Sequence, residues 1–466
     1  MRTRLLSAAA LAAMAICGNA TAETLPEALT DALQSNPALS SQRAQLNAVR
    51  QELPLAWSEA LPQISGSASA NRQQTSESNF LLTVRQQPEY WIGTINSSTL
   101  LFGSGRVYSA TNQARAQIAS AVASYDNAAQ DLMMQVVSAY GSVIFARSAK
   151  DAQERALANL QEQLRYVQAN VDHGFLTRTD LAQAQARVEQ ARAGVAGADA
   201  DLVQANETYL RLVGHPAGEL ETPDVLPNPP SDLETALDVA GRENPKIVAA
   251  ESDVAAARAA IGVAAAQGRA RVTFETSDSV FGGIDNHRFR DGQSEDTLSV
   301  RVTVPFFSGG ANAARTRQQN YRHAATQYDL ADTERKVHED VSVAWANVAA
   351  TRTTVTSSQS RLEAAELAQR GMVREQQAGL RTTIDVLNQE QELLSARVDL
   401  ARAQRDALVA DRQMAATMGR LAVESLPNGP VTQASGEASN DHLVVQPHSR
   451  RAAHVHHRPV TQPEPR

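Results

Sequence analysis

Ten histidines and one cysteine are the side chains of this 466-residue sequence that most often act as metal ligands, nucleophiles or proton carriers. Five of the histidines are scattered along the body of the chain, at His173, His215, His287, His323 and His338. None belongs to an HExxH helix, and the sequence has neither a nucleophile elbow nor a phosphate-binding glycine loop. The sequence therefore predicts no enzyme, no cofactor and no energy-coupling site.

The other five histidines lie in the last 25 residues, where the chain is rich in Pro, Ser and His. His454, His456 and His457 are close enough in sequence to bind a transition metal adventitiously. This composition is nevertheless typical of a disordered segment, which we expect over residues 425–466. We accordingly predict no dedicated metal site and do not infer metal efflux from the tail.

The first 22 residues have the order of a secretory signal peptide. Arg2 and Arg4 precede an apolar run that ends at Cys17, and Ala20-Thr21-Ala22 forms an A-x-A cleavage site. Cys17 is the only cysteine, and Ile16 is too large for lipoprotein cleavage before it, so we expect no lipid anchor. Loss of Arg2 and Arg4 changes the net charge from −8 to −10, which argues against nucleic acid as a partner.

The elements that would position any site occur twice along the chain. Asn36-Pro37 corresponds to Asn244-Pro245 at an offset of 208 residues. LLFGSGR corresponds to PFFSGGA, and GFLTRTDLAQAQ to AGLRTTIDVLNQ, both at an offset of 205. Three landmarks in one order indicate duplication. We predict a first structural repeat over 23–221, a proline-rich hinge over 222–232 and a second repeat over 233–424.

Each repeat should begin with about 35 helical residues, which restart at the Asn-Pro pair because asparagine caps a helix and proline suits its first turn. A hairpin should follow, its strands at about 63–75 and 90–102 in the first repeat, and at about 269–280 and 297–307 in the second. The last of these strands alternates most clearly, with one apolar face formed by Leu298, Val300, Val302, Val304 and Phe306.

Long helices complete each repeat. Residues 105–173 contain no proline and would span roughly 100 Å as one helix, at 1.5 Å per residue. Apolar residues there and around Leu387 and Leu394 recur at coiled-coil spacing. The mean hydropathy is −0.33, and no segment after the signal has the 18 consecutive apolar residues of a membrane helix. If the chain enters a membrane, it should do so as strands.

Strands in lipid must close into a barrel, because every backbone polar group there needs a partner. Barrels begin at about eight strands, whereas the predicted hairpins supply four. A membrane role therefore requires several copies of the chain. Aromatic residues at the strand ends would suit the two interfacial girdles of a barrel, although sheet-end core residues would have the same pattern; they are Tyr90, Trp91, Phe102, Phe306 and Phe307.

In this duplicated order of helix, hairpin and long helices, with its paired Asn-Pro, FGSGR/FFSGG and GLRTTIDVLN segments, the chain resembles the TolC family up to about residue 424. The resemblance implies a mainly α protein with a small β part, a homotrimer with a 12-stranded outer-membrane barrel in lipid and a long periplasmic helical barrel. It further implies a passive exit duct of a tripartite efflux pump or type I secretion system. The implied partners are a periplasmic adaptor and an inner-membrane pump of RND or ABC type.

The resemblance also assigns the gate at the periplasmic end. Asp385 and Asn388 match the two positions of the family's acidic rings, so the second ring has lost its charge. Arg381 matches the arginine that ties the closed coils together, with Thr179 and Asp180 as its expected partners. A further link made by a tyrosine in the family falls on Gln376. The adaptor should dock on the helix tips near Gly174 and Gly379.

Two other classes of protein fit part of the pattern. A soluble periplasmic coiled-coil scaffold would explain the heptads and the acidic charge, but would leave the two apolar hairpins without a purpose. A trimeric adhesin or autotransporter also combines rods with a shared barrel, but normally has its strands at the C-terminus. Within the channel interpretation, drugs, metals and secreted proteins are all open as cargo.

Overall fold

The computed structural model describes residues 22–72, 75–79, 82–86, 89–223, 232–285, 288–289 and 292–421. The tail over 425–466, nearly all of the signal peptide and most of the hinge lie outside the described residues, so these three assignments stay predictions.

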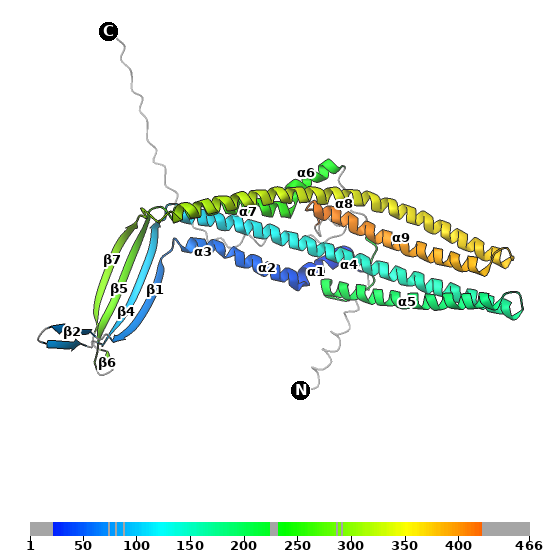
Figure 1. The fold of residues 1–466 in the computed structure, drawn as a ribbon, viewed down its shortest axis with the longest axis horizontal. Coiled ribbons are helices and arrows are strands. Elements are labelled where there is room, and N and C mark those ends of the chain that lie inside the picture. Colours follow the sequence, from blue (N-terminus) through cyan, green and yellow to red (C-terminus); the bar gives the residue numbers. More distant parts are fainter. Residues whose placement is uncertain are drawn as a thin grey trace, which may run out of the picture. The chain divides into compact units, whose positions relative to one another are not determined.

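Helices dominate the described chain, and their order recurs in its two halves (Figure 1). The first half contains α1 (Leu25–Ser35), α2 (Pro37–Arg50), α3 (Glu52–Ser58), α4 (Arg106–Asp172) and α5 (Arg178–Val213). The second half contains α6 (Leu233–Glu243), α7 (Pro245–Ala266), α8 (Ala311–Gln377) and α9 (Thr383–Thr417). Both α4 and α8 have 67 residues, so the uninterrupted rod predicted over 105–173 is confirmed and has a counterpart.

The helical residues at the start of each half divide where the sequence predicts. The side chain of Asn36 accepts a hydrogen bond from the amide of Ala38, and that of Asn244 accepts one from Lys246, both at 2.9 Å. Each asparagine thus caps a helix whose first residue is proline. The restart at both Asn-Pro pairs is confirmed, and a second break at Gln51 separates α3 from α2.

One antiparallel sheet joins the two halves. It has the order β1 (Gln63–Arg72), β4 (Glu89–Phe102), β5 (Arg271–Asp285) and β7 (Gln293–Thr303), and the short β6 (Arg288–Phe289) pairs with the end of β5. The two predicted hairpins are therefore present as β1–β4 and β5–β7. The sequence did not predict that β4 and β5 would pair along nearly their whole length and join them.

Two details of the strands differ from the prediction. The strand β7 ends at Thr303 rather than near residue 307, because Pro305 has no amide to donate to the ladder. The segment between β1 and β4, where the sequence predicted no strand beyond residue 75, contains the paired strands β2 (Thr75–Asn79) and β3 (Leu82–Gln86). β-branched residues such as Thr83 and Val84 favour this extended conformation.

The long helices bury apolar side chains between one another rather than in a globular core. Along its length α4 contacts α5, α7 and α9, while α8 contacts α7 and α9 (Figure 1). The largest buried cluster lies where α1, α4, α5 and α9 meet and includes Leu29, Val136, Tyr140, Tyr209 and Val213. Among the described helices, none combines the length and apolar character needed to cross a bilayer.

Candidate functional site

The residues assigned to the gate lie at two turns, where α4 passes into α5 and α8 passes into α9 (Figure 1). Gly174 and Gly379 have φ values of 78° and 77°, a left-handed conformation that glycine adopts without strain. The next residues, Phe175 and Leu380, donate their amides back to carbonyls five residues earlier, each at 2.8 Å. Their side chains are 79% and 74% exposed, so each tip presents one apolar residue to its surroundings.

Both tips continue into a helix that begins with a capping box. The hydroxyl of Thr177 donates to the Asp180 carboxylate at 2.7 Å, and Thr382 donates to Asp385 at the same distance. The threonine amides donate to the same carboxylates. These hydrogen bonds lower the pKa of both aspartates below the ordinary value, so both are ionised at neutral pH. Asp180 and Asp385 are therefore structural counterparts, although the resemblance assigned them different gate roles.

Arg381 does not contact its expected partners within one chain. Its Nε donates to the Glu375 carboxylate at 2.8 Å, near the end of α8. In the described part of the chain, no hydrogen bond joins Arg381 to Thr179 or Asp180. Thr179 itself is exposed on the other helix pair. The clasp between these residues thus stays a prediction about neighbouring helix pairs.

Asn388 lies one helical turn beyond Asp385 on α9, as predicted for two rings on one face. Its side-chain oxygen accepts a hydrogen bond from Arg187 Nη2 on α5 at 3.1 Å. Arg187 was not among the predicted gate residues. It follows Asp180 by seven residues, a coiled-coil repeat that places both on the same face of α5. That spacing could have identified it.

Gln376 is buried, and its Nε2 has no hydrogen-bond partner among the described residues. It lines a cavity of about 180 Å³ between α4, α8 and α9. Glu390 lies in the same cavity, where its carboxylate accepts hydrogen bonds from Asn159 at 2.8 Å and Gln369 at 3.3 Å. Burial raises the pKa of Glu390 above its ordinary value.

The burial of Glu390 and its polar partners was not predicted from the sequence, although the sequence contains a signal for it. Glu390 lies between Leu387 and Leu394, whose spacing marks the buried face of α9. A carboxylate at such a position is rarely buried without partners. The second tip therefore combines exposed charges with a buried carboxylate behind them, and its helix contacts depend on polar groups.

Comparison with known proteins assigns the family. Residues 28–215 and 236–420 match the family described as "Outer membrane efflux protein". The chain is 30% identical to outer membrane efflux protein BepC of Brucella suis, over 87% of this chain and 88% of that protein. It is 26% identical to the alkaline protease secretion protein AprF of Pseudomonas aeruginosa, over 81% of each.

The fold agrees with this match. The CmeC outer membrane channel of Campylobacter jejuni superposes with a TM-score of 0.75 at 15% sequence identity, over 85% of each chain. The duplicated helices, the single sheet shared by the two halves and the two capped tips are thus those of an outer-membrane channel fold. The chain belongs to the outer membrane efflux protein family, and it serves as an outer-membrane exit duct for efflux or type I secretion.

Proposed function

We propose that three copies of the chain assemble into one duct, in which three four-stranded sheets close into a 12-stranded barrel in outer-membrane lipid. The sheet is the observation that carries this proposal. Among the described strands, β1 pairs with β4 alone and β7 pairs with β5 alone, so both outer edges are open. Edges in lipid must be paired, and joining β1 of one copy to β7 of the next pairs all of them.

Exposed apolar side chains on the sheet support the same assembly. Leu298, Val300 and Val302 on β7 are 72%, 61% and 63% exposed. They alternate with Ser299, Arg301 and Thr303 on the opposite face. One face of the barrel therefore suits lipid and the other suits water.

The two longest helices also support a trimer. The helix α4 has 16 buried residues within one chain, whereas α8, which is also 67 residues long, has five. Leu367 and Val343 on α8 are 67% and 53% exposed. Contact with a neighbouring copy would cover this helix and complete a helical barrel.

We place the gate of the duct at the helix tips. In the closed trimer, Asp385 and Asn388 face the threefold axis, and Arg381 exchanges Glu375 for Thr179 and Asp180 of an adjacent helix pair. Gln376 contributes through packing inside its own helix pair, because it is buried there. Three Asp385 carboxylates at one mouth concentrate negative potential, which attracts cations and repels anions.

The duct is passive, and a pump in the inner membrane, of RND or ABC type, supplies the energy. A periplasmic adaptor docks on the tips at Gly174 and Gly379, where Phe175 and Leu380 offer exposed apolar side chains. Membership of a channel family supports the absence of catalysis. The soluble scaffold and the adhesin are not supported, since the matched family is one of outer-membrane efflux proteins.

Conductance in planar bilayers tests the duct and the clasp separately. The detergent-purified chain is first shown to be trimeric by sedimentation, and the parent is then compared with Arg381→Ser. We expect small discrete channels that enlarge in the variant. A matched control is Arg361→Ser, which removes the exposed ion pairs of Arg361 on α8 with Glu392 and Asp399 on α9 and should leave the conductance unchanged.

Each other outcome has a distinct meaning. Channels of unchanged size in Arg381→Ser keep the duct and discard the clasp. A protein that never inserts into bilayers discards the duct. Block by multivalent cations should weaken in Asp385→Ala, and equal block in the variant and the parent would remove the ring from the proposal.

A further inference from the structure

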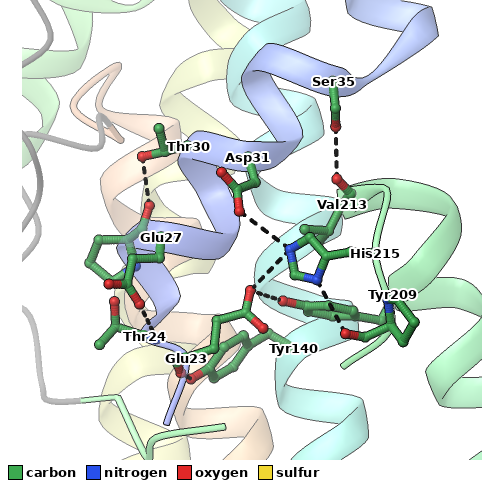
Figure 2. A network of polar contacts seen from close by, with 12 residues as sticks. Glu23, Thr24, Glu27, Thr30, Asp31, Ser35, Tyr140, Tyr209, Val213 and His215 are labelled. Carbon is green, nitrogen blue, oxygen red and sulfur yellow. Dashed lines mark hydrogen bonds and ion pairs between the residues drawn. The ribbon is translucent and has the colours of Figure 1, made fainter. Parts of the chain in front are cut away.

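We infer that Glu23, Asp31 and His215 form a binding site for a divalent transition-metal ion such as Zn²⁺. The three residues come from the segment before α1, from α1 itself and from the loop after α5, and their side chains converge in Figure 2. Nε2 of His215 lies 3.5 Å from Glu23 Oε1 and 3.3 Å from Asp31 Oδ2. Nothing in the proposed gate or duct uses this cluster.

The orientation of the imidazole places a lone pair between the two carboxylates. Nδ1 of His215 lies 3.2 Å from the carbonyl oxygen of Pro216. A carbonyl oxygen can only accept a hydrogen bond, so Nδ1 carries the proton and donates it. In the neutral ring Nε2 then has no proton. With a neutral ring, three electron-pair donors face one another, and a metal cation can lie between them.

The spacing of the donors fits a tetrahedral ion. Zn²⁺ binds histidine nitrogen and carboxylate oxygen at roughly 2.0–2.2 Å, which separates adjacent tetrahedral ligands by about 3.3–3.5 Å. The two distances from His215 have these values, and all three ligand atoms lie within 4.8 Å of one another. One histidine and two carboxylates leave a fourth position for water.

Glu23 is held in place by a second layer of hydrogen bonds. The hydroxyl of Tyr209 donates to the same carboxylate oxygen, Oε1, that faces His215. The Tyr140 hydroxyl lies between two carbonyl oxygens, that of Glu221 at 2.6 Å and that of Glu23 at 2.8 Å, and shares its one proton between them. The main-chain nitrogen of Glu23 donates to the Glu219 carbonyl at 2.7 Å. Both tyrosine rings are buried. Such outer contacts fix a ligand's orientation and raise metal affinity.

The backbone around His215 is equally constrained. Gly214 ends α5 with a φ of 101°, and its amide donates to the Leu210 carbonyl. From the beginning of the chain, Ser35 Oγ donates to the Val213 carbonyl at 2.7 Å, and Asn36 Nδ2 donates to the Leu212 carbonyl at 3.1 Å. The end of α5 is therefore tied to the end of α1, which carries Asp31.

In the second half, the end of α9 is tied to the end of α6 in the same way, but the side chains at this junction differ. Asn244 Nδ2 donates to the Thr417 carbonyl at 2.7 Å, and Gly419 takes the place of Gly214 at the 205-residue offset. Arg420 then stands where His215 stands, and its guanidinium donates two hydrogen bonds to Glu243 at 2.7 Å. The second junction thus carries its own cation, whereas the first supplies three ligands for one.

The test uses the full chain with its tail histidines removed, because they would bind metal themselves. His442, His448, His454, His456 and His457 are replaced by Ser, and purification uses a histidine-free tag at the C-terminus. Cleavage after Ala22 makes Glu23 the first residue of the mature chain, so all three ligand side chains remain, and the Glu23 nitrogen becomes an ammonium group that can still donate to the Glu219 carbonyl. Zn²⁺ binding is measured by calorimetry and Co²⁺ binding by visible absorption, with sedimentation confirming the same assembly for every variant.

We expect one ion per chain and the intense absorption of tetrahedral Co²⁺. His215→Ala and Asp31→Asn should weaken binding by at least about 10-fold, and Tyr209→Phe, which keeps all three ligands, by about 10-fold. His173→Ser, the matched exposed histidine, should have no effect. The proposal fails if the tail-substituted parent binds no ion, as it would if the imidazole is only protonated. It also fails if His215→Ala retains the parent's affinity.

Discussion

The two helix tips share a backbone but differ in their side chains. Both have a left-handed glycine and a Thr–Asp capping box. At the first tip, Leu176 packs with the apolar cluster between α4 and α5. At the corresponding position of the second tip, Arg381 is exposed and pairs with Glu375. One tip is therefore anchored by apolar packing and the other by an ion pair in water.

The difference continues behind the tips. Val171 in the first half corresponds to the buried Gln376 in the second, and Gln185 corresponds to the buried Glu390. The two copies thus have one geometry, and the second has polar or charged groups where the first has apolar or uncharged ones. Apolar packing holds one arrangement, whereas an exposed ion pair adds little stability and can be exchanged. If the gate opens as proposed, we therefore expect the second tip to move and the first tip to stay in place.

The largest expected effect comes from the residue that links the tips. Leu387 lies on α9 but is fully buried in the cluster formed by Val167, Val188 and their neighbours on α4 and α5. Leu387→Ala should cost about 2–5 kcal/mol. Hydrogen exchange followed by mass spectrometry should therefore show faster exchange at both tips.

Ala182 is the matched position on α5 and is exposed, so Ala182→Ser should leave exchange at both tips nearly as in the parent. Faster exchange at the second tip alone in Leu387→Ala would show that the two tips are not coupled through this cluster.

A smaller and equal effect is expected from the caps. Thr177→Ala and Thr382→Ala each remove the hydroxyl of one capping box and should each destabilise their own tip by about 1 kcal/mol. The measurement is again exchange at the two tips at neutral pH. Unequal losses would mean that the shared backbone is supported differently in the two copies.

The sequence predicted the backbone conformation of the two tips better than it predicted their side-chain contacts. The Gly, Thr and Asp residues of each tip recur at one offset, and their conformations depend on local chemistry, so both turns and both caps could be located. The partners of Arg381 and Asn388 depend on how four helices are placed around one another. No local pattern reports that placement, so the pairing of Arg381 with Glu375 could not be predicted; for Arg187, the seven-residue spacing from Asp180 indicates its face of α5 but not its partner.

Acidification should affect the stability of the two helix pairs differently, because only the second pair contains the buried carboxylate of Glu390. Burial raises its pKa in the folded chain, so its stabilising contribution is complete below the unfolded pKa of about 4.3 and is lost as pH rises through the folded value. Thermal unfolding of the parent, followed by circular dichroism, should therefore occur at higher temperature as pH falls toward about 4.5.

Glu390→Gln should remove this part of the pH dependence. The caps respond in the opposite direction, because the pKa values of Asp180 and Asp385 are lowered; their contribution is lost at still lower pH, in parent and variant alike. Identical pH profiles for the parent and Glu390→Gln above about pH 4.5 would remove the buried carboxylate from this account.

The smallest effect on stability should come from the residue with the largest effect on conductance. Arg381 is exposed, and an exposed ion pair such as the one that it forms with Glu375 contributes little to stability, because water screens both charges. Exchange at the second tip should therefore change little in Arg381→Ser, while the channel enlarges. Leu176→Ala should behave in the opposite way, with faster exchange at the first tip and unchanged conductance. If Arg381→Ser instead loosens its own tip as much as the cap variants do, the ion pair is structural, and the division into a tip that holds and a tip that moves is wrong.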